Sequence, residues 1–126
     1  MKPYEFEQLV CDHYRQKGYR VQTTSASNDY GIDVFAEKKG EKIAVQVKMY
    51  GGSTRKVNRQ TMMELYGAAA YFDCTKAVLA TDGEVLTDAK EVAHKLGIDI
   101  LFIQPDRKIS MPSASSAEWI LADIIW

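Results

Sequence analysis

Three polar residues on two neighbouring predicted strands have types and a spacing that suit metal-dependent chemistry. Asp33 lies inside a predicted strand between Ile32 and Val34, where an acid is costly to bury unless a cation needs it. Gln46 and Lys48 share the polar face of the next predicted strand, about 7 Å apart at the usual strand rise of roughly 3.3 Å per residue. If the two strands pair as a hairpin, the three side chains converge.

This cluster has the ligand chemistry of a magnesium site. A carboxylate, an amide oxygen and water are hard oxygen ligands, and the Lys48 ammonium beside them can orient water and offset charge that develops on a phosphate. The cluster therefore suits phosphodiester hydrolysis. The alternative for Asp33, Gln46 and Lys48 is an ordinary amphipathic hairpin whose polar face is solvated.

Glu7 stands at the border of the apolar stripe of the first predicted helix, from which it can lean over the sheet. An exposed acid in the first helical turn, favoured by the helix dipole, is the alternative reading of Glu7.

The elements that position these residues follow from the periodicity of the apolar residues. In chain order the sequence predicts a helix over 3–17, strands over 19–24, 31–36 and 42–48, a helix over 57–72, a strand over 76–81, a helix that ends at Gly97 and a strand over 98–103. Asp88 and Glu91 are predicted to form a capping box for the third helix. The later βαβ steps favour parallel pairing, which predicts an α/β fold with a mixed sheet of about five strands flanked by helices.

The end of the chain is predicted to leave the core. Residues 104–115 are expected to form a polar linker, and a short terminal helix is expected to follow, capped by Ser115 and Glu118. Its apolar residues would pack on the body of the domain or on another subunit of a homodimer; they are Trp119, Ile120, Ile124 and Trp126.

The composition is that of one ordinary domain over residues 1–126, with 46% hydrophobic residues, 26% charged residues and a net charge of −1. The longest apolar and small run, 66–72, is well short of the roughly 20 residues of a membrane helix. The first ten residues lack the apolar stretch of a secretion signal, so we expect a cytoplasmic protein without a membrane partner. Cys11 and Cys74 belong to no CxxC pair, and no zinc site is expected.

A basic window interrupts this balanced composition. Residues 38–59 contain seven Lys and Arg residues against Glu41 alone. Such a window fits an anionic partner such as a phosphate backbone, and its alternative is a solvated hairpin and loop.

Two segments resemble the catalytic core of the Mrr-type restriction endonucleases, within the PD-(D/E)XK nuclease superfamily. They are residues 28–33 (NDYGID) and 45–50 (VQVKMY). Residues 6–10 followed by Gly18 and Tyr19 are similar to the opening helix of that family, and residues 80–98 are similar to its closing βαβ unit. The resemblance covers roughly residues 4–103 and implies a restriction-endonuclease-like fold and a DNA substrate.

The resemblance also implies roles for individual residues. Asp33 corresponds to the metal-binding acid, Gln46 takes the place of the second acid, Lys48 corresponds to the catalytic lysine, and Glu7 corresponds to the helix acid that helps to hold or hydrate the metal. We therefore expect Asp33, Gln46 and Val47 to hold Mg²⁺ or Mn²⁺. Since glutamine removes one negative charge, we predict weaker magnesium binding than in a two-acid site.

DNA contacts are expected on both sides of this centre. Arg55, Lys56 and Arg59 would grip the phosphate backbone, Tyr50 would stack or contact the backbone, and Asp29 lies in the loop before the metal-binding acid. Such contacts position DNA and do not specify its sequence. The stretch after the core is short for a target-recognition domain, so we expect poor sequence preference.

Two other functions remain open from the sequence. One is a homodimeric nuclease that recognises DNA structure, as Holliday-junction resolvases of the same superfamily do. The other is a DNA-binding module of a larger complex that does not cleave, against which the intact set of Asp33, Gln46 and Lys48 argues. A nucleotide cofactor is not expected, because residues 51–56 only mimic the composition of a phosphate-binding loop.

Overall fold

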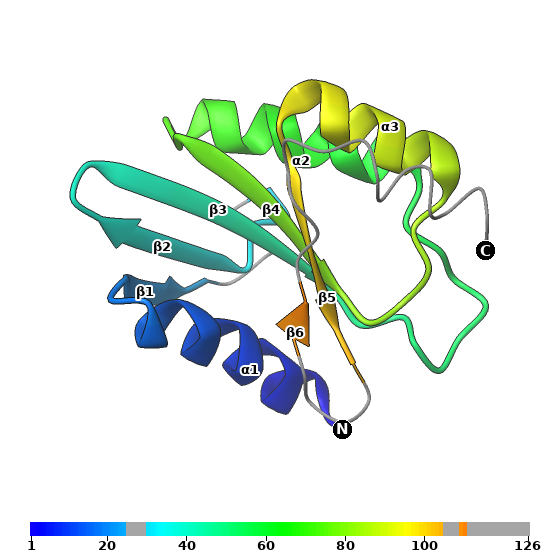
Figure 1. Ribbon diagram of the computed structural model, residues 1–126, viewed down its shortest axis with the longest axis horizontal. Helices are drawn as coiled ribbons and strands as arrows, with labels where there is room; N and C mark the ends of the chain where they lie inside the picture. The colour runs from blue at the N-terminus through cyan, green and yellow to red at the C-terminus, as the bar shows by residue number, and fades with distance from the viewer. Residues whose placement is uncertain (25–29, 105–108, 111–126) are drawn as a thin grey trace.

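The structure, a computed structural model, describes residues 1–24, 30–104 and 109–110 of the 126-residue chain. Up to residue 103 its elements follow the order predicted from the sequence (Figure 1). The elements are α1 Pro3–Gln16, β1 Arg20–Thr23, β2 Val34–Lys38, β3 Glu41–Lys48, α2 Arg59–Tyr71, β4 Lys76–Thr81, α3 Thr87–Leu96, β5 Asp99–Ile103 and β6 Ile109–Ser110.

One mixed sheet in the spatial order β1-β2-β3-β4-β5-β6 organises the domain. The β1–β2–β3 pairs are antiparallel, β3–β4 and β4–β5 are parallel, and β6 pairs antiparallel with β5. The predicted α/β class with a mixed, helix-flanked sheet is therefore confirmed. The short strand β6 falls within 104–115, which was predicted as a polar linker, and this part of the prediction is wrong.

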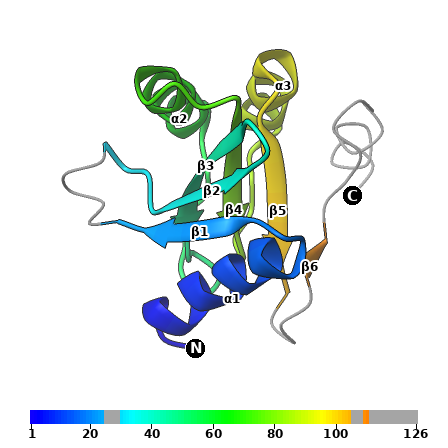
Figure 2. The same ribbon diagram turned by 90° about the vertical axis from the view of Figure 1, so that its left-hand side faces the viewer.

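Helices cover both faces of the sheet, with α1 on one face and α2 and α3 on the other (Figure 2). The residue alternation of β3 supplies both cores: Val45 packs with the residues of α1, whereas Ala44 packs with those of α2 and α3. The alternative of a fully solvated polar face on β3 is therefore wrong, because Ala44 and Gln46 on that face are both buried.

The hairpin that the site requires is present, with Val34 of β2 opposite Val45 of β3. The second strand was predicted to begin at Gly31, but β2 begins at Val34, so Asp33 precedes the strand by one residue. Positive φ angles of 54° at Tyr30 and 87° at Gly31 turn the chain just before it. The backbone ladder still reaches Asp33, whose N–H donates to the Val45 carbonyl at 2.9 Å.

The start of α3 also differs from the prediction. Leu86 is the N-cap and contributes no side-chain cap, so the predicted capping box of Asp88 and Glu91 is wrong. A bridge between Val57 and Val85 fixes the chain there instead, because the Leu86 N–H donates to the Val57 carbonyl at 3.0 Å.

The prediction of a helix at the end of the chain has a different outcome from the predictions for the core. The predicted terminal helix, from Ser115 to Trp126, lies outside the described residues, so it and the homodimer surface on it stay predictions.

In the described part of the chain, none of the helices has the length and apolar content needed to cross a bilayer.

Candidate active site

Asp33 is the centre of the candidate site, and strand β3 orients its carboxylate. Oδ2 of Asp33 accepts a 2.7 Å hydrogen bond from the backbone N–H of Val47. The Asp33 carboxylate thereby pairs with an N–H group of β3 that a backbone carbonyl of the neighbouring strand would otherwise bind. Burial raises the pKa of Asp33, while the Val47 hydrogen bond and the positive charge of Lys48 lower it in part.

Gln46 provides a neutral oxygen on the neighbouring strand. Its side chain is only 7% exposed, and its Oε1 is buried without a hydrogen-bond partner among the described residues. A buried hydrogen-bond acceptor without a partner destabilises the folded state by roughly 1–3 kcal/mol. A hard cation would satisfy that oxygen, so the donor set of Asp33 and Gln46 fits a divalent metal ion such as magnesium.

Gly31 makes the room that the Gln46 amide occupies. A Cβ atom on Gly31 would lie 2.9 Å from Nε2 of Gln46, and the φ angle of 87° at this position disfavours any other residue. Sequence reasoning did not assign Gly31, although a glycine two residues before Asp33 is visible in the sequence. Gly31 therefore contributes to the site because the absence of a side chain leaves space for the Gln46 amide.

Lys48 and Glu7 bring opposite charges to Asp33. Lys48 ends β3, is partly buried and lies close enough to act electrostatically on the Asp33 carboxylate. Glu7 comes from α1, and burial together with the negative charge of Asp33 raises the pKa of Glu7. Glu7 is partly buried and so differs from the fully exposed acid considered as its alternative.

The described residues contain no group of three or more His, Cys, Asp or Glu side chains placed to hold a metal ion. A metal at this site would therefore depend on the Gln46 amide and on backbone groups as well as on carboxylates. Val47 contributes a backbone N–H to the site through its bond to Asp33. The assignment of Val47 as a metal ligand stays a prediction.

A polar turn after β4 holds the end of β3, and sequence reasoning missed it. The Thr81 hydroxyl donates to the Lys48 carbonyl at 2.7 Å and accepts from the Gly83 N–H at 3.0 Å. Oδ1 of Asp82 accepts from the N–H groups of Tyr50 and Gly51 at 2.7 and 2.9 Å. The available signal was the Thr-Asp-Gly triplet at residues 81–83, which begins at the last residue of the apolar strand β4.

The described side chains that were predicted to contact DNA interact with other residues in this structure. The Arg55 guanidinium lies over the Tyr50 ring at 4.5 Å, and Tyr50 is only 9% exposed, so its ring does not offer a free face for base stacking. Lys56 and Arg59 are exposed and form ion pairs with Glu84 and Asp88 at 3.1 and 3.2 Å; the remaining predicted contact, Asp29, lies outside the described residues.

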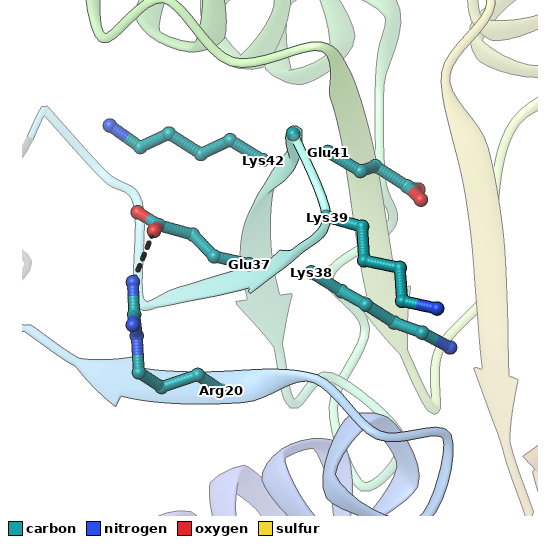
Figure 3. Close-up of a pocket in the computed structure, with 7 residues that line it drawn as sticks. Arg20, Glu37, Lys38, Lys39, Glu41 and Lys42 are labelled. Atoms are coloured by element: carbon teal, nitrogen blue, oxygen red, sulfur yellow. Dashed lines mark hydrogen bonds and ion pairs between the residues drawn. The ribbon is translucent and has the colours of Figure 1, made fainter.

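A second charged region lies at the hairpin end of β2 and β3 (Figure 3). In the register of this pair, that end is opposite the end next to Asp33. Four cations line this hollow of about 370 Å³, and three of them, Arg20, Lys38 and Lys42, have partners within the domain. Arg20 pairs with Glu37 at 2.7 Å, Lys38 donates to the Lys17 carbonyl at 2.7 Å, and Lys42 donates to the Phe72 carbonyl at 3.0 Å. These contacts join β1 to β2, β2 to the end of α1, and β3 to the end of α2, which indicates a structural role.

Comparison with known proteins identifies the family of this chain and two relatives. Residues 1–108 match the family Mrr_cat, described as a restriction endonuclease. The chain is 34% identical over 98 residues to the uncharacterized protein y4cE of Sinorhizobium fredii (strain NBRC 101917 / NGR234), which covers 69% of this chain and 25% of that protein. It is 39% identical over 49 residues to a UPF0102 protein of Aquifex aeolicus (strain VF5), which covers 38% of this chain and 48% of that protein.

A solved structure shares the fold. The crystal structure of a protein of unknown function, AF1548, superposes with a TM-score of 0.63 at 18% identity over 94% of this chain and 65% of the other. The chain therefore spans less than two thirds of the length of each of these three proteins. The family match over most of the chain, together with this restriction-endonuclease-like fold, places the protein in the Mrr catalytic-domain family of restriction endonucleases.

Proposed function

We propose that this domain is a metal-dependent DNA endonuclease that hydrolyses phosphodiester bonds. The observation that carries the proposal is the Asp33 carboxylate, which is half-buried, fixed by the Val47 N–H and flanked by the Lys48 charge. Family membership supports nuclease chemistry in general. The metal requirement and the endonucleolytic cleavage go beyond family membership and are our proposal.

Asp33 and Gln46 would hold the divalent ion, which when bound supplies Lewis-acid activation of a phosphate oxygen. Asp33 provides the negative charge, and Gln46 provides the buried oxygen that has no partner among the described residues. A site with one acid and one amide binds a cation less tightly than a two-acid site. We therefore expect Mg²⁺ to be needed at millimolar rather than micromolar concentrations, with Mn²⁺ as an effective substitute.

Lys48 and Glu7 would act on the water and on the phosphate. The Lys48 ammonium orients the attacking water and stabilises the negative charge that develops on the phosphate oxygens. Glu7, whose pKa is raised by burial and by the charge of Asp33, accepts hydrogen bonds from water at the same centre. Removing one such charge-stabilising group lowers the rate by about 10²–10³-fold in comparable sites.

The test is cleavage of supercoiled, linear, single-stranded and four-way-junction DNA with Mg²⁺, with Mn²⁺ or with EDTA. Metal-dependent cleavage by the wild type that is lost in both Asp33→Ala and Lys48→Ala is the expected result. Paired symmetrical nicks in the junction alone would identify a junction resolvase instead. DNA binding without cleavage under any metal would contradict the proposal and favour a binding module.

A further inference from the structure

Two exposed tyrosines, Tyr30 and Tyr71, lie next to two phenylalanines that pack against the core, Phe35 and Phe72, and the proposed chemistry uses none of these rings. Tyr30 and Tyr71 are each 67% exposed, and their ring centroids lie 5.2 Å apart. Phe72 continues the group, 6.0 Å from Tyr30, and packs against Phe35 at 5.3 Å. We refer to Tyr30, Phe35, Tyr71 and Phe72 as the aromatic cluster.

A hollow of about 450 Å³ opens between the exposed rings, lined by Tyr30, Glu64, Gly67, Ala68 and Tyr71. Gly67 stands in the middle of α2, where glycine destabilises a helix relative to alanine. Nothing lies within 4 Å of the position that a Cβ on Gly67 would take, so packing does not demand a glycine there. The missing side chain instead leaves the floor of the hollow open next to the rings.

The position of the hollow ties it to the candidate active site. Tyr30 precedes Asp33 by three residues, a backbone span of no more than about 11 Å. This length corresponds to about three nucleotides at the roughly 3.4 Å spacing along one DNA strand. A strand with a phosphate at Asp33 is therefore long enough for a base a few nucleotides away to reach Tyr30, which lines the hollow.

The chemistry of the lining suits a nucleobase. Aromatic faces stack on any base, and a carboxylate such as that of Glu64 accepts a hydrogen bond from a base amino group. A cation borders the aromatic cluster, because the Lys42 ammonium lies 5.1 Å from the Phe35 ring centroid and donates to the Phe72 carbonyl. This hydrogen bond ties the end of α2, and with it the aromatic cluster, to β3.

We propose that the aromatic cluster binds an unpaired nucleobase of the substrate strand, a few nucleotides from the phosphate that is cleaved. This inference rests on the proposed DNA endonuclease function and defines its substrate as DNA that contains an unpaired or extruded nucleotide. Stacked bases inside a perfect duplex cannot enter the hollow without the cost of unpairing.

The test compares binding of a perfect duplex with binding of the same duplex carrying one unpaired 2-aminopurine nucleotide, in EDTA so that no cleavage occurs. The wild type is expected to quench the 2-aminopurine and to bind the bulged duplex about tenfold more tightly. Tyr71→Ala is expected to lose both effects, and Tyr71→Phe is expected to keep them. Tyr66→Ala is the matched control, because Tyr66 is an exposed tyrosine of α2 that does not line this hollow.

Gly67→Leu provides a variant that does not weaken the fold. Leucine is the better helix former, so the variant is expected to be at least as stable as the wild type while it fills the hollow and removes the bulge preference. Equal binding of both duplexes by the wild type, or an unchanged preference in Tyr71→Ala and Gly67→Leu, overturns the inference. A change from dimer to monomer in Tyr71→Ala with the preference intact also overturns it, and identifies a second copy of the chain as the occupant.

Cleavage separates this inference from the proposed function. Metal-dependent nicking of a perfect duplex by both the wild type and Tyr71→Ala, without a bulge preference in either, retains the nuclease and rejects the stacking site. Selective bulge binding by a wild type that cuts nothing retains the stacking site and rejects the nuclease.

Discussion

The backbone N–H of Val47 donates a 2.7 Å hydrogen bond to Oδ2 of Asp33, so the strand that carries Gln46 and Lys48 also fixes the acid beside them. The acid and the neighbouring groups thus share one rigid frame, the β2–β3 hairpin. Rigid support of this kind is what a catalytic constellation needs, because small displacements lower the rate strongly.

The pKa shifts at this centre predict how stability depends on pH. Burial raises the pKa of Asp33 from its ordinary 3.8, so above pH 3.8 the folded protein binds more protons than the unfolded chain. The stability that this group contributes is present below the unfolded pKa and is lost as pH rises through the raised folded pKa. Glu7 acts in the same direction, because its pKa is raised from 4.5.

Asp33→Asn is predicted to remove the loss of stability that ionisation of the Asp33 carboxyl group causes as pH rises. In metal-free buffer the free energy of unfolding of the variant, relative to the wild type, is expected to grow as pH rises from about 4 and then to level off. Chemical denaturation at a series of pH values measures the difference. A stability difference that shrinks with rising pH would show that the Asp33 pKa is lowered rather than raised.

Gly31→Ala is predicted to damage the site through Gln46. The new Cβ would lie 2.9 Å from Gln46 Nε2, and a displaced amide is expected to lower the cleavage rate by about a hundredfold. The matched control is Gly40→Ala, because Gly40 has a similar φ of 82° but nothing within 4 Å of its Cβ position. Both variants are expected to lose about 1–2 kcal/mol of stability, and equal cleavage rates in both would contradict the role given to Gly31.

Sequence patterns predict the parts of this molecule that depend on local periodicity. The positions of Gln46 and Lys48 on one face of a strand follow from residue alternation, and the hairpin with Asp33 follows from the short turn at Lys39 and Gly40. What sequence reasoning missed depends on contacts between segments distant along the chain. The bond from Thr81 to Lys48 joins residues 33 positions apart, and no local pattern encodes it.

Two further differences have the same origin. Asp88 resembles an N-cap in sequence, but its carboxylate pairs with Arg59 of α2 at 3.2 Å, and the chain entering α3 is fixed by the Val57–Val85 bridge. Tyr50 resembles an exposed loop aromatic, but it is buried with the residues of α2 and α3. Packing between α2 and α3 decides both cases, and it becomes visible only in three dimensions.

Thr81→Val is predicted to loosen the end of β3. The substitution leaves the Lys48 carbonyl without its donor and the Gly83 N–H without its acceptor. Since both groups are partly buried, we expect a total loss of stability of about 1–3 kcal/mol and slower cleavage. Thr81→Ser keeps the hydroxyl and is expected to restore the cleavage rate. If Thr81→Ser is as slow as Thr81→Val, the hydroxyl is not what positions Lys48.

Lys56→Ala is predicted to weaken DNA binding in a salt-dependent way. Its exposed ion pair with Glu84 contributes little, so Lys56 is free to exchange that partner for a phosphate. Loss of one phosphate contact is expected to reduce the slope of log affinity against log salt by about 0.9, equally for all sequences. Lys95→Ala, an exposed lysine in the last turn of α3, serves as the control and is expected to leave the slope unchanged.

The most direct test of the account is Mn²⁺ binding, followed through the electron paramagnetic resonance of the free ion, in the wild type, Asp33→Asn and Asp12→Asn. Asp12 is an exposed acid of α1 that pairs with Arg15, so its variant controls for loss of charge alone. The account predicts one Mn²⁺ site in the wild type and in Asp12→Asn that is lost in Asp33→Asn together with DNA nicking. Equal Mn²⁺ binding and equal nicking in Asp33→Asn would contradict it.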